Sequence, residues 1–150
     1  MPGKHKILLL FSLSAQLLFS QLQVKNFFNI TGRKNVGVNT AVQDRTGFLW
    51  LGTADGLFKF DGREAEKIFP GNSSLSTRVT ALYLDSQQRI WVGTESGRVF
   101  YISGKKLDSV DLAPFSITRK ITSFFDTGDG ICIGTYGNGI LFKNHDTIKV

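Results

Sequence analysis

One spacing of 41 residues recurs along the chain and limits the folds that it can adopt. Residues of three kinds keep this spacing, namely an aspartate, a glycine and the threonine that follows it. The positions are Asp44, Asp85 and Asp126; Gly52, Gly93 and Gly134; and Thr53, Thr94 and Thr135. Repeats of about 40 to 45 residues with strand-like content are typical of β-propeller blades. Helical repeats of similar length need an apolar period of 3.6 residues, which the chain does not show.

Each copy predicts four short strands joined by turns, so the expected fold is all-β. A continuous apolar run, such as residues 48–53, predicts a strand that is buried on both faces between neighbouring sheets. The expected fold is a partial β-propeller over residues 21–150, with three four-stranded antiparallel blades at about 37–70, 78–113 and 120–150. The expected strands are 38–42, 48–53, 57–60 and 66–69; 79–84, 90–94, 98–102 and 107–112; and 121–125, 131–135, 140–143 and 147–150.

The copies differ at positions that bear on packing. The second copy has Gln88 where the first has Gly47, so this turn has to close without a glycine. The third copy has Cys132 where the others have Trp50 and Trp91, which predicts smaller packing and a buried, inert thiol. The two tryptophans lie inside apolar strands, so we expect them to fill the core rather than to stack on sugars. The repeated glycine is expected where backbones approach closely.

Two stretches resemble the two-component regulator propeller repeat: Asp44–Leu57 (DRTGFLWLGTADGL) and Ile90–Gly97 (IWVGTESG). The pattern is an acidic turn with a glycine, an apolar-Trp-apolar-Gly-Thr strand and a Gly-Leu pair. The first copy matches nearly throughout, the second lacks the first glycine and the leucine, and the third lacks the tryptophan. The resemblance covers about residues 38–150.

This resemblance implies an extracytoplasmic ligand-sensing propeller of a two-component signal transduction system. Such repeats commonly form periplasmic sensor regions of bacterial hybrid sensor histidine kinases, often in the control of glycan uptake. In those proteins many repeats precede a linking β-domain, a membrane helix and a kinase. The chain is therefore expected to be the N-terminal part of such a sensor and not itself an enzyme.

The first 20 residues have the composition of a secretory signal peptide. Lys4, His5 and Lys6 form a positive start, and an apolar run of 13 residues follows. That run is shorter than the about 20 residues that span a bilayer, and Ser20 precedes the expected cleavage site. An uncleaved membrane anchor stays open, because Leu18 occupies a position where a small residue is preferred. The mature chain is expected in the periplasm or secreted.

Three repeats predict an incomplete ring, because propellers close with about 4 to 8 blades. We expect the front piece of a longer protein, in which residues 24–31 form an outer strand that completes the last blade. In a rival hypothesis, two copies meet through apolar blade faces and close a six-bladed ring. The expected partners are the missing blades or a second copy, together with a small-molecule or oligosaccharide ligand. Contact with a membrane is expected only through downstream segments of the longer protein.

The charge pattern argues against nucleic acid as a partner. The chain carries 18 basic and 12 acidic side chains. Without Lys4 and Lys6 of the leader, 16 basic side chains remain, and the net charge is +4. These basic residues are scattered along the sequence, whereas nucleic-acid binders gather them on one face.

The residues suggest no catalytic, metal-binding or cofactor-binding site, and no cofactor is expected. The single cysteine excludes an internal disulfide framework and a multi-cysteine metal site. His145 lies in a polar loop, where a solvated histidine is the ordinary case. Asp126, Asp129 and Asp146 lack the alternation of a calcium loop, and turn capping accounts for Asp126. Two alternatives to a sensor stay open: a secreted propeller enzyme acting on glycans, with catalytic residues in other blades, and a non-catalytic protein-interaction propeller.

Overall fold

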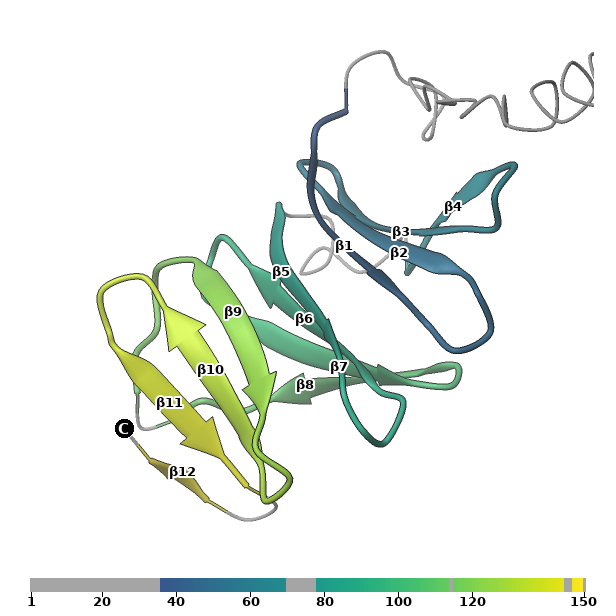
Figure 1. Ribbon diagram of the computed structural model, residues 1–150. Coiled ribbons are helices and arrows are strands. Elements are labelled where there is room, and N and C mark those ends of the chain that lie inside the picture. Colours follow the sequence, from purple (N-terminus) through teal and green to yellow (C-terminus); the bar gives the residue numbers. More distant parts are fainter. Residues whose placement is uncertain (1–35, 70–77, 114, 145–146, 150) are drawn as a thin grey trace, which may run out of the picture.

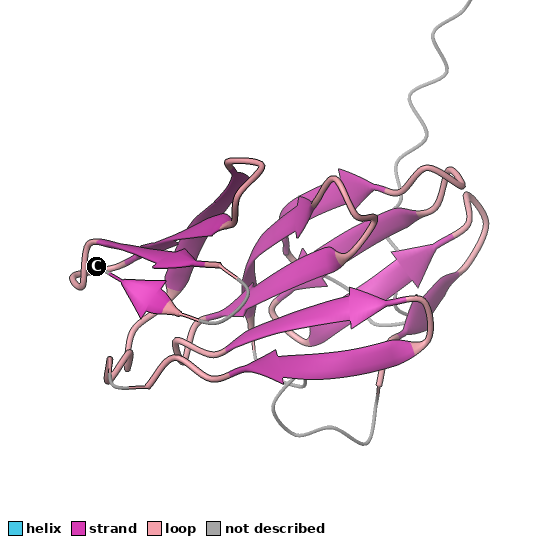
Figure 2. Cartoon of the chain, turned by 90° about the horizontal axis from the view of Figure 1, so that it is seen from below, coloured by secondary structure: helices cyan, strands magenta, loops and turns pink. Residues whose placement is uncertain are grey.

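The structure is a computed structural model that describes residues 36–69, 78–113, 115–144 and 147–149. The predicted signal peptide at 1–20 and the predicted outer strand at 24–31 lie outside these residues. Every regular element in the described ranges is a β-strand (Figures 1 and 2). Within the same ranges, no helix has the length and hydropathy that crossing a membrane requires.

The described strands form three four-stranded antiparallel sheets, and each sheet consists of four consecutive strands. Their bounds are β1 (Val38–Gln43), β2 (Leu49–Thr53), β3 (Gly56–Phe60) and β4 (Ala65–Lys67); β5 (Val79–Leu84), β6 (Ile90–Thr94), β7 (Val99–Ser103) and β8 (Lys106–Val110); and β9 (Ile121–Asp126), β10 (Ile131–Thr135), β11 (Ile140–Lys143) and β12 (Ile148–Lys149). These sheets coincide with the three sequence repeats, and we call them blades 1, 2 and 3. The prediction of three antiparallel four-stranded blades is confirmed.

The outer strand β4 differs from its prediction more than the inner strands do. It ends at Lys67, whereas the sequence predicted a strand to residue 69. Phe69 has a φ of 51°, outside the extended region, so the strand cannot continue through it. Inner strands such as β5, β6 and β10 match their predicted bounds, because a buried apolar run specifies both ends.

The blades follow one another in space as an open array (Figure 1). Their first strands lie side by side, with β5 between β1 and β9. The hydrophobic core lies between the sheets, and there are two such layers. The layer between blades 1 and 2 contains Trp50, Leu57, Val79, Ile90, Val92, Phe100 and Ile102. The layer between blades 2 and 3 contains Ala81, Trp91, Val99, Ile121, Phe124, Ile131, Ile133 and Leu141.

Blade 3 pairs its first two strands one residue out of step with the other blades. In blade 2, Trp91 pairs with Tyr83, eight residues earlier, and blade 1 has the same spacing. In blade 3, Cys132 pairs with Phe125, seven residues earlier. The constant 41-residue period of the sequence conceals this change, because the aspartate and the glycine keep their spacing.

The shift arises at the turn between the first two strands. In blade 2 this turn closes without glycine, as predicted, and Gln88 adopts the positive φ (65°) that Gly47 adopts in blade 1. In blade 3 the Thr127 N–H donates to the Gly130 carbonyl at 3.0 Å, which leaves a loop of two residues. Gly128, the first of these, has a φ of 88°, as the tighter turn requires.

Candidate functional site: a cleft between blades 2 and 3

The repeated aspartate and tryptophan of blades 1 and 2 bind each other across the turn. Trp91 Nε1 donates to Asp85 Oδ2 at 2.8 Å, and Trp50 Nε1 donates to Asp44 Oδ2 at 2.9 Å. The other carboxylate oxygen of each aspartate accepts two backbone N–H groups of its own turn. We call this arrangement the Asp–Trp clasp. It satisfies the buried indole and the turn donors with one side chain.

These hydrogen bonds hold the pKa of Asp44 below its ordinary value. Burial is the largest single effect and would raise the pKa. The Thr46 hydroxyl, the Trp50 indole and backbone N–H groups of the turn together outweigh it, because each stabilises the ionised carboxylate. The clasp of blade 1 therefore contains a charged Asp44 at neutral pH.

In blade 2 the clasp also holds an arginine. Asp85 is only 2% exposed, and Arg89 Nε lies 2.6 Å from its Oδ2 atom. The Arg89 guanidinium lies 5.3 Å from the ring centroids of both Trp91 and Tyr101. This stack of one cation on two rings covers the face of blade 2 that points toward blade 3.

In blade 3 the equivalent aspartate bonds to the neighbouring blade. Asp126 Oδ2 accepts from the Ser86 backbone N–H at 3.1 Å and from the Ser86 hydroxyl at 2.8 Å. Asp126 Oδ1 accepts from the Gly128 N–H at 2.8 Å, so the predicted turn capping is confirmed. The backbone N–H groups of Gly128 and Ser86, followed by the Ser86 hydroxyl, lower the pKa of Asp126.

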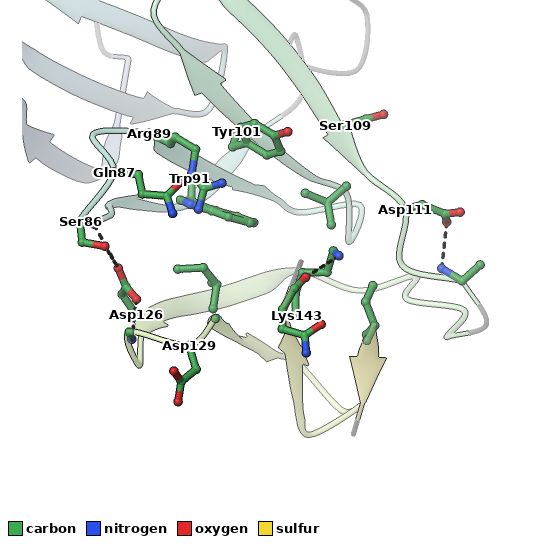
Figure 3. Close-up of a pocket in the computed structure, with 17 residues that line it drawn as sticks. Ser86, Gln87, Arg89, Trp91, Tyr101, Ser109, Asp111, Asp126, Asp129 and Lys143 are labelled. Carbon is green, nitrogen blue, oxygen red and sulfur yellow. Dashed lines mark hydrogen bonds between the residues drawn. The ribbon is translucent and has the colours of Figure 1, made fainter. Parts of the chain in front are cut away.

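The Ser86–Asp126 contact lies at one end of a cleft with a volume of ≈ 500 Å³ between blades 2 and 3 (Figure 3). In the figure, the side chains of blade 2 face those of blade 3 across this space. Blade 2 lines it with Ser86, Gln87, Arg89, Trp91, Tyr101, Ser109 and Asp111, and blade 3 lines it with Asp126, Asp129, Lys143 and Asn144.

The charges of the cleft favour an uncharged, hydroxyl-rich ligand. Its three carboxylates face two cations, and Arg89 is already paired with Asp85. An anion would therefore meet more negative than positive charge. Asp111 and Asp129 are exposed, and carboxylate oxygens accept hydrogen bonds from hydroxyl groups. Tyr101 is half-buried and adds an aromatic surface.

The structure places the other sequence-predicted residues as follows. Trp50 and Trp91 are 7% and 3% exposed, which confirms that they fill the core. Cys132 is half-buried, so the prediction of a buried thiol is wrong. It lies on the face of blade 3 that points away from blade 2, whereas the corresponding Trp50 and Trp91 face the blade that follows theirs. His145 and Asp146 lie outside the described residues.

Asp126 and Asp129 both line the cleft. Across the described ranges, no group of three or more His, Cys, Asp or Glu side chains is placed to hold a metal ion. The contributions of Ser86, Arg89 and Tyr101 to a shared cleft were not predicted. Ser86 and Arg89 differ from the residues at these positions in the other copies, and Tyr101 shares only its aromatic character with Phe60 and Phe142. The packing of blade 2 on blade 3 brings all three opposite Asp129.

Comparison with known proteins supports the blade assignment. Residues 73–96, which include β5 and β6, match the family model described as "Two component regulator propeller". The extracellular domain of BT4673 from B. thetaiotaomicron, described as a one-component system, matches 77% of this chain with a TM-score of 0.63 and 18% identity. A second structure of that extracellular domain, described as a hybrid two-component system, matches 74% of this chain with a TM-score of 0.42 and 20% identity. No curated protein matches the chain.

The matches span 16% and 20% of the two BT4673 structures, so this chain corresponds to a small part of each. At 18% identity the first match shows a shared fold. The segment that matches the family model provides the inner strands of blade 2. Blade 2 therefore contains a segment that matches the two-component regulator propeller model, within an array of blades that shares the fold of part of a bacterial extracellular domain.

Proposed function

We propose that the chain belongs to the extracytoplasmic, ligand-sensing propeller of a two-component signal transduction system. The observation that carries this proposal is the regulator-propeller repeat at residues 73–96, in the middle of an all-β array. The predicted signal peptide at 1–20 supports a location in the periplasm or outside the cell. The output, a histidine kinase, would belong to a longer protein of which this chain is the N-terminal part.

The ligand that we propose is a neutral oligosaccharide bound in the cleft between blades 2 and 3. The exposed carboxylates of Asp111 and Asp129 would accept hydrogen bonds from sugar hydroxyl groups. A ligand that touches both blades binds best at one spacing between them, and it would shift the population toward that spacing. A change in the spacing between blades is a signal that the propeller could pass to a membrane-coupled output.

A ligand screen by thermal unfolding tests this proposal. Neutral oligosaccharides should raise the unfolding temperature, because a ligand at 100 times its Kd stabilises the folded state by about 2.7 kcal/mol. Uronic acid and sulfated oligosaccharides should have weaker effects. If no neutral oligosaccharide shifts the transition and an anionic one does, the proposed ligand class is wrong.

A pair of variants locates the binding site. Asp129→Asn removes an exposed charge in the cleft, and it should weaken binding about tenfold or more, because hydrogen bonds to charged groups contribute about 1.5–3 kcal/mol. Glu66→Gln removes an exposed charge on β4 of blade 1 and is the matched control. Equal affinities of both variants and the parent chain would place the ligand elsewhere.

Export is tested separately. Mass spectrometry of the chain from a periplasmic fraction should find a mature N-terminus at Gln21. Recovery of the chain only from the cytoplasm, with Met1 still present, would contradict the extracytoplasmic role. A secreted enzyme would differ from a sensor by altering the sugar that it binds, and a scaffold would differ by binding no sugar.

A further inference from the structure

The two junctions between blades share one arrangement at their inner edge. A Cβ atom placed on Gly52 would lie 2.6 Å from Val79 Cγ1, and one placed on Gly93 would lie 2.5 Å from Ile121 Cγ2. Val79 and Ile121 are fully buried. The repeated glycine is therefore a socket for a β-branched side chain, which we call the plug, from the first strand of the next blade. The sequence predicted a close approach of backbones at this glycine, whereas the atoms nearest to it in the structure belong to side chains.

A hydrogen bond accompanies each plug. Asn39 Nδ2 donates to the Val79 carbonyl at 2.9 Å, and Thr80 Oγ1 donates to the Ile121 carbonyl at 2.6 Å. In both cases the acceptor is the carbonyl of the plug residue itself. The donors belong to corresponding positions, because Asn39 follows Val38 and Thr80 follows Val79. The same hydrogen bond is therefore donated by an amide at one junction and by a hydroxyl at the other, from corresponding positions.

Blade 3 carries both elements of this junction on its far face, without a plug. Gly134 is its socket glycine, and Thr122, which follows Ile121, is its donor. The three atoms nearest to a Cβ placed on Gly134 all belong to Thr122 and Ser123 of the same blade. Phe125 and Ile140, on either side, are 64% and 63% exposed. On this face, side chains of the first strand of blade 3 alone cover the socket glycine, and exposed apolar side chains border it.

We propose that the far face of blade 3 binds the first strand of a further propeller blade. That strand would insert a valine or isoleucine at Gly134 and offer the carbonyl of this residue to Thr122. The argument is continuity with two junctions that the same chain already forms. A helix or an irregular loop would not present a β-branched side chain and its own carbonyl in this register.

A second copy of the chain fits the socket less well. Its plug would be Val38, which corresponds to Val79 and Ile121 and is 47% exposed. Docking would also need the apolar face of blade 1 around Leu51 and Phe58. Leu51 and Phe58 correspond to Ile133 and Leu141, which pack against blade 2. Leu51 and Phe58 are already buried in the single chain, with exposed fractions of 5% and 6%, so they offer little open surface to a second copy. The occupant that we propose is therefore a further blade.

An extended chain tests the proposal. A second copy of residues 111–150 is added after Val150, so that it supplies a natural linker and a duplicate of Ile121 as the plug. The original Cys132 lies on the face concerned and reports docking through its reaction with a thiol reagent. The duplicate carries Cys132→Ser, so only one thiol reacts. We expect the reaction to slow about tenfold or more, because docking buries the thiol.

The matched control carries Ile121→Asp in the duplicate and should react at the rate of the unextended chain. If the extended chain also keeps that rate, the proposal is overturned, because the same 40 residues dock at the socket of Gly93. A dimer of the unextended chain that Val38→Asp abolishes in sedimentation would also overturn it, since a second copy would then be the occupant. Neither result depends on whether the chain binds an oligosaccharide.

Discussion

The turns of blades 2 and 3 use the same aspartate in different ways. In blade 2, Asp85 binds Trp91 of its own blade, and in blade 3, Asp126 binds Ser86 of the neighbouring blade. Both cap backbone N–H groups of their own turn. Capping is thus the shared role, and the second carboxylate oxygen takes the donor that lies within reach. The one-residue shift of register in blade 3 turns Asp126 toward blade 2, so a contact within a blade is replaced by a contact between blades.

The largest expected difference in stability is between variants of Trp91 and Cys132, which occupy the same position in their repeats. Trp91→Ala should lower the free energy of unfolding by about 3–5 kcal/mol, because it removes a large buried side chain. Cys132→Ala should cost less than about 1 kcal/mol, because Cys132 is small and half-buried. Urea unfolding of both variants measures the difference, and losses of similar size would contradict the comparison.

The next largest difference in stability is expected between variants of Asp85 and Asp126. Asp85→Ala should cost about 2–3 kcal/mol, because it leaves the buried indole N–H of Trp91 without its acceptor. Asp126→Ala should cost less, since the groups that Asp126 binds are exposed and water can replace it. The same unfolding assay ranks them. A greater loss at Asp126 would mean that the contact between blades matters more than the clasp.

The glycines Gly93 and Gly134 provide a third contrast, because the next blade packs on the first and side chains of its own blade cover the second. Gly93→Ala should cost about 1–3 kcal/mol through overpacking, because the new methyl group meets Ile121 of the next blade. Gly134→Ala should cost less, because its neighbours Thr122 and Ser123 are exposed side chains that can rotate away. Equal losses in thermal unfolding would show that the glycine serves its own blade.

A smaller effect of opposite sign is expected at the turn of blade 2. Gln88→Gly should raise the stability by up to about 1 kcal/mol, because glycine adopts a positive φ without the steric cost of a side chain. Gly47→Gln should lower the stability of blade 1 by a similar amount. Urea midpoints at a constant m value measure both changes. A loss of stability in Gln88→Gly would show that the glutamine side chain outweighs the strain.

The pH dependence is expected to be the smallest effect. The pKa values of Asp44 and Asp126 are lowered in the folded chain, so the folded state binds fewer protons than the unfolded state. Their contribution is present above the ordinary aspartate pKa of about 3.9 and is lost as the pH falls through the lower folded value. Asp126→Asn should flatten the fall in urea midpoint below that pH. An unchanged slope would mean that Asp126 contributes nothing to it.

The blades could be predicted from the sequence because each strand is specified by its own local run of residues. The apolar runs at Val79–Leu84 and Ile90–Thr94 mark buried strands, and their bounds agree with the structure. The register of blade 3 was not predictable from the period, because the shorter turn at Gly128 is hidden by the unchanged spacing of Asp126 and Gly134.

The candidate site was beyond this reasoning for a different physical reason. Arg89 and Asp129 come from separate repeats, and no sequence pattern relates positions that differ between copies. Asp126 did carry a signal, because it occupies the aspartate position although its tryptophan is missing. That combination frees a carboxylate oxygen, and the sequence could have prompted a search for another donor.

The glycine socket has a further consequence, since it gives the array of blades a polarity. Each contact joins a socket on one blade to a plug on the next, so the two surfaces are complementary but unlike. A contact that joined Gly134 of one copy directly to Gly134 of another would bring two sockets together, and it would gain none of the packing that Val79 and Ile121 provide. Association through this surface can only be heterologous, proceeding head to tail in the direction in which the chain itself runs.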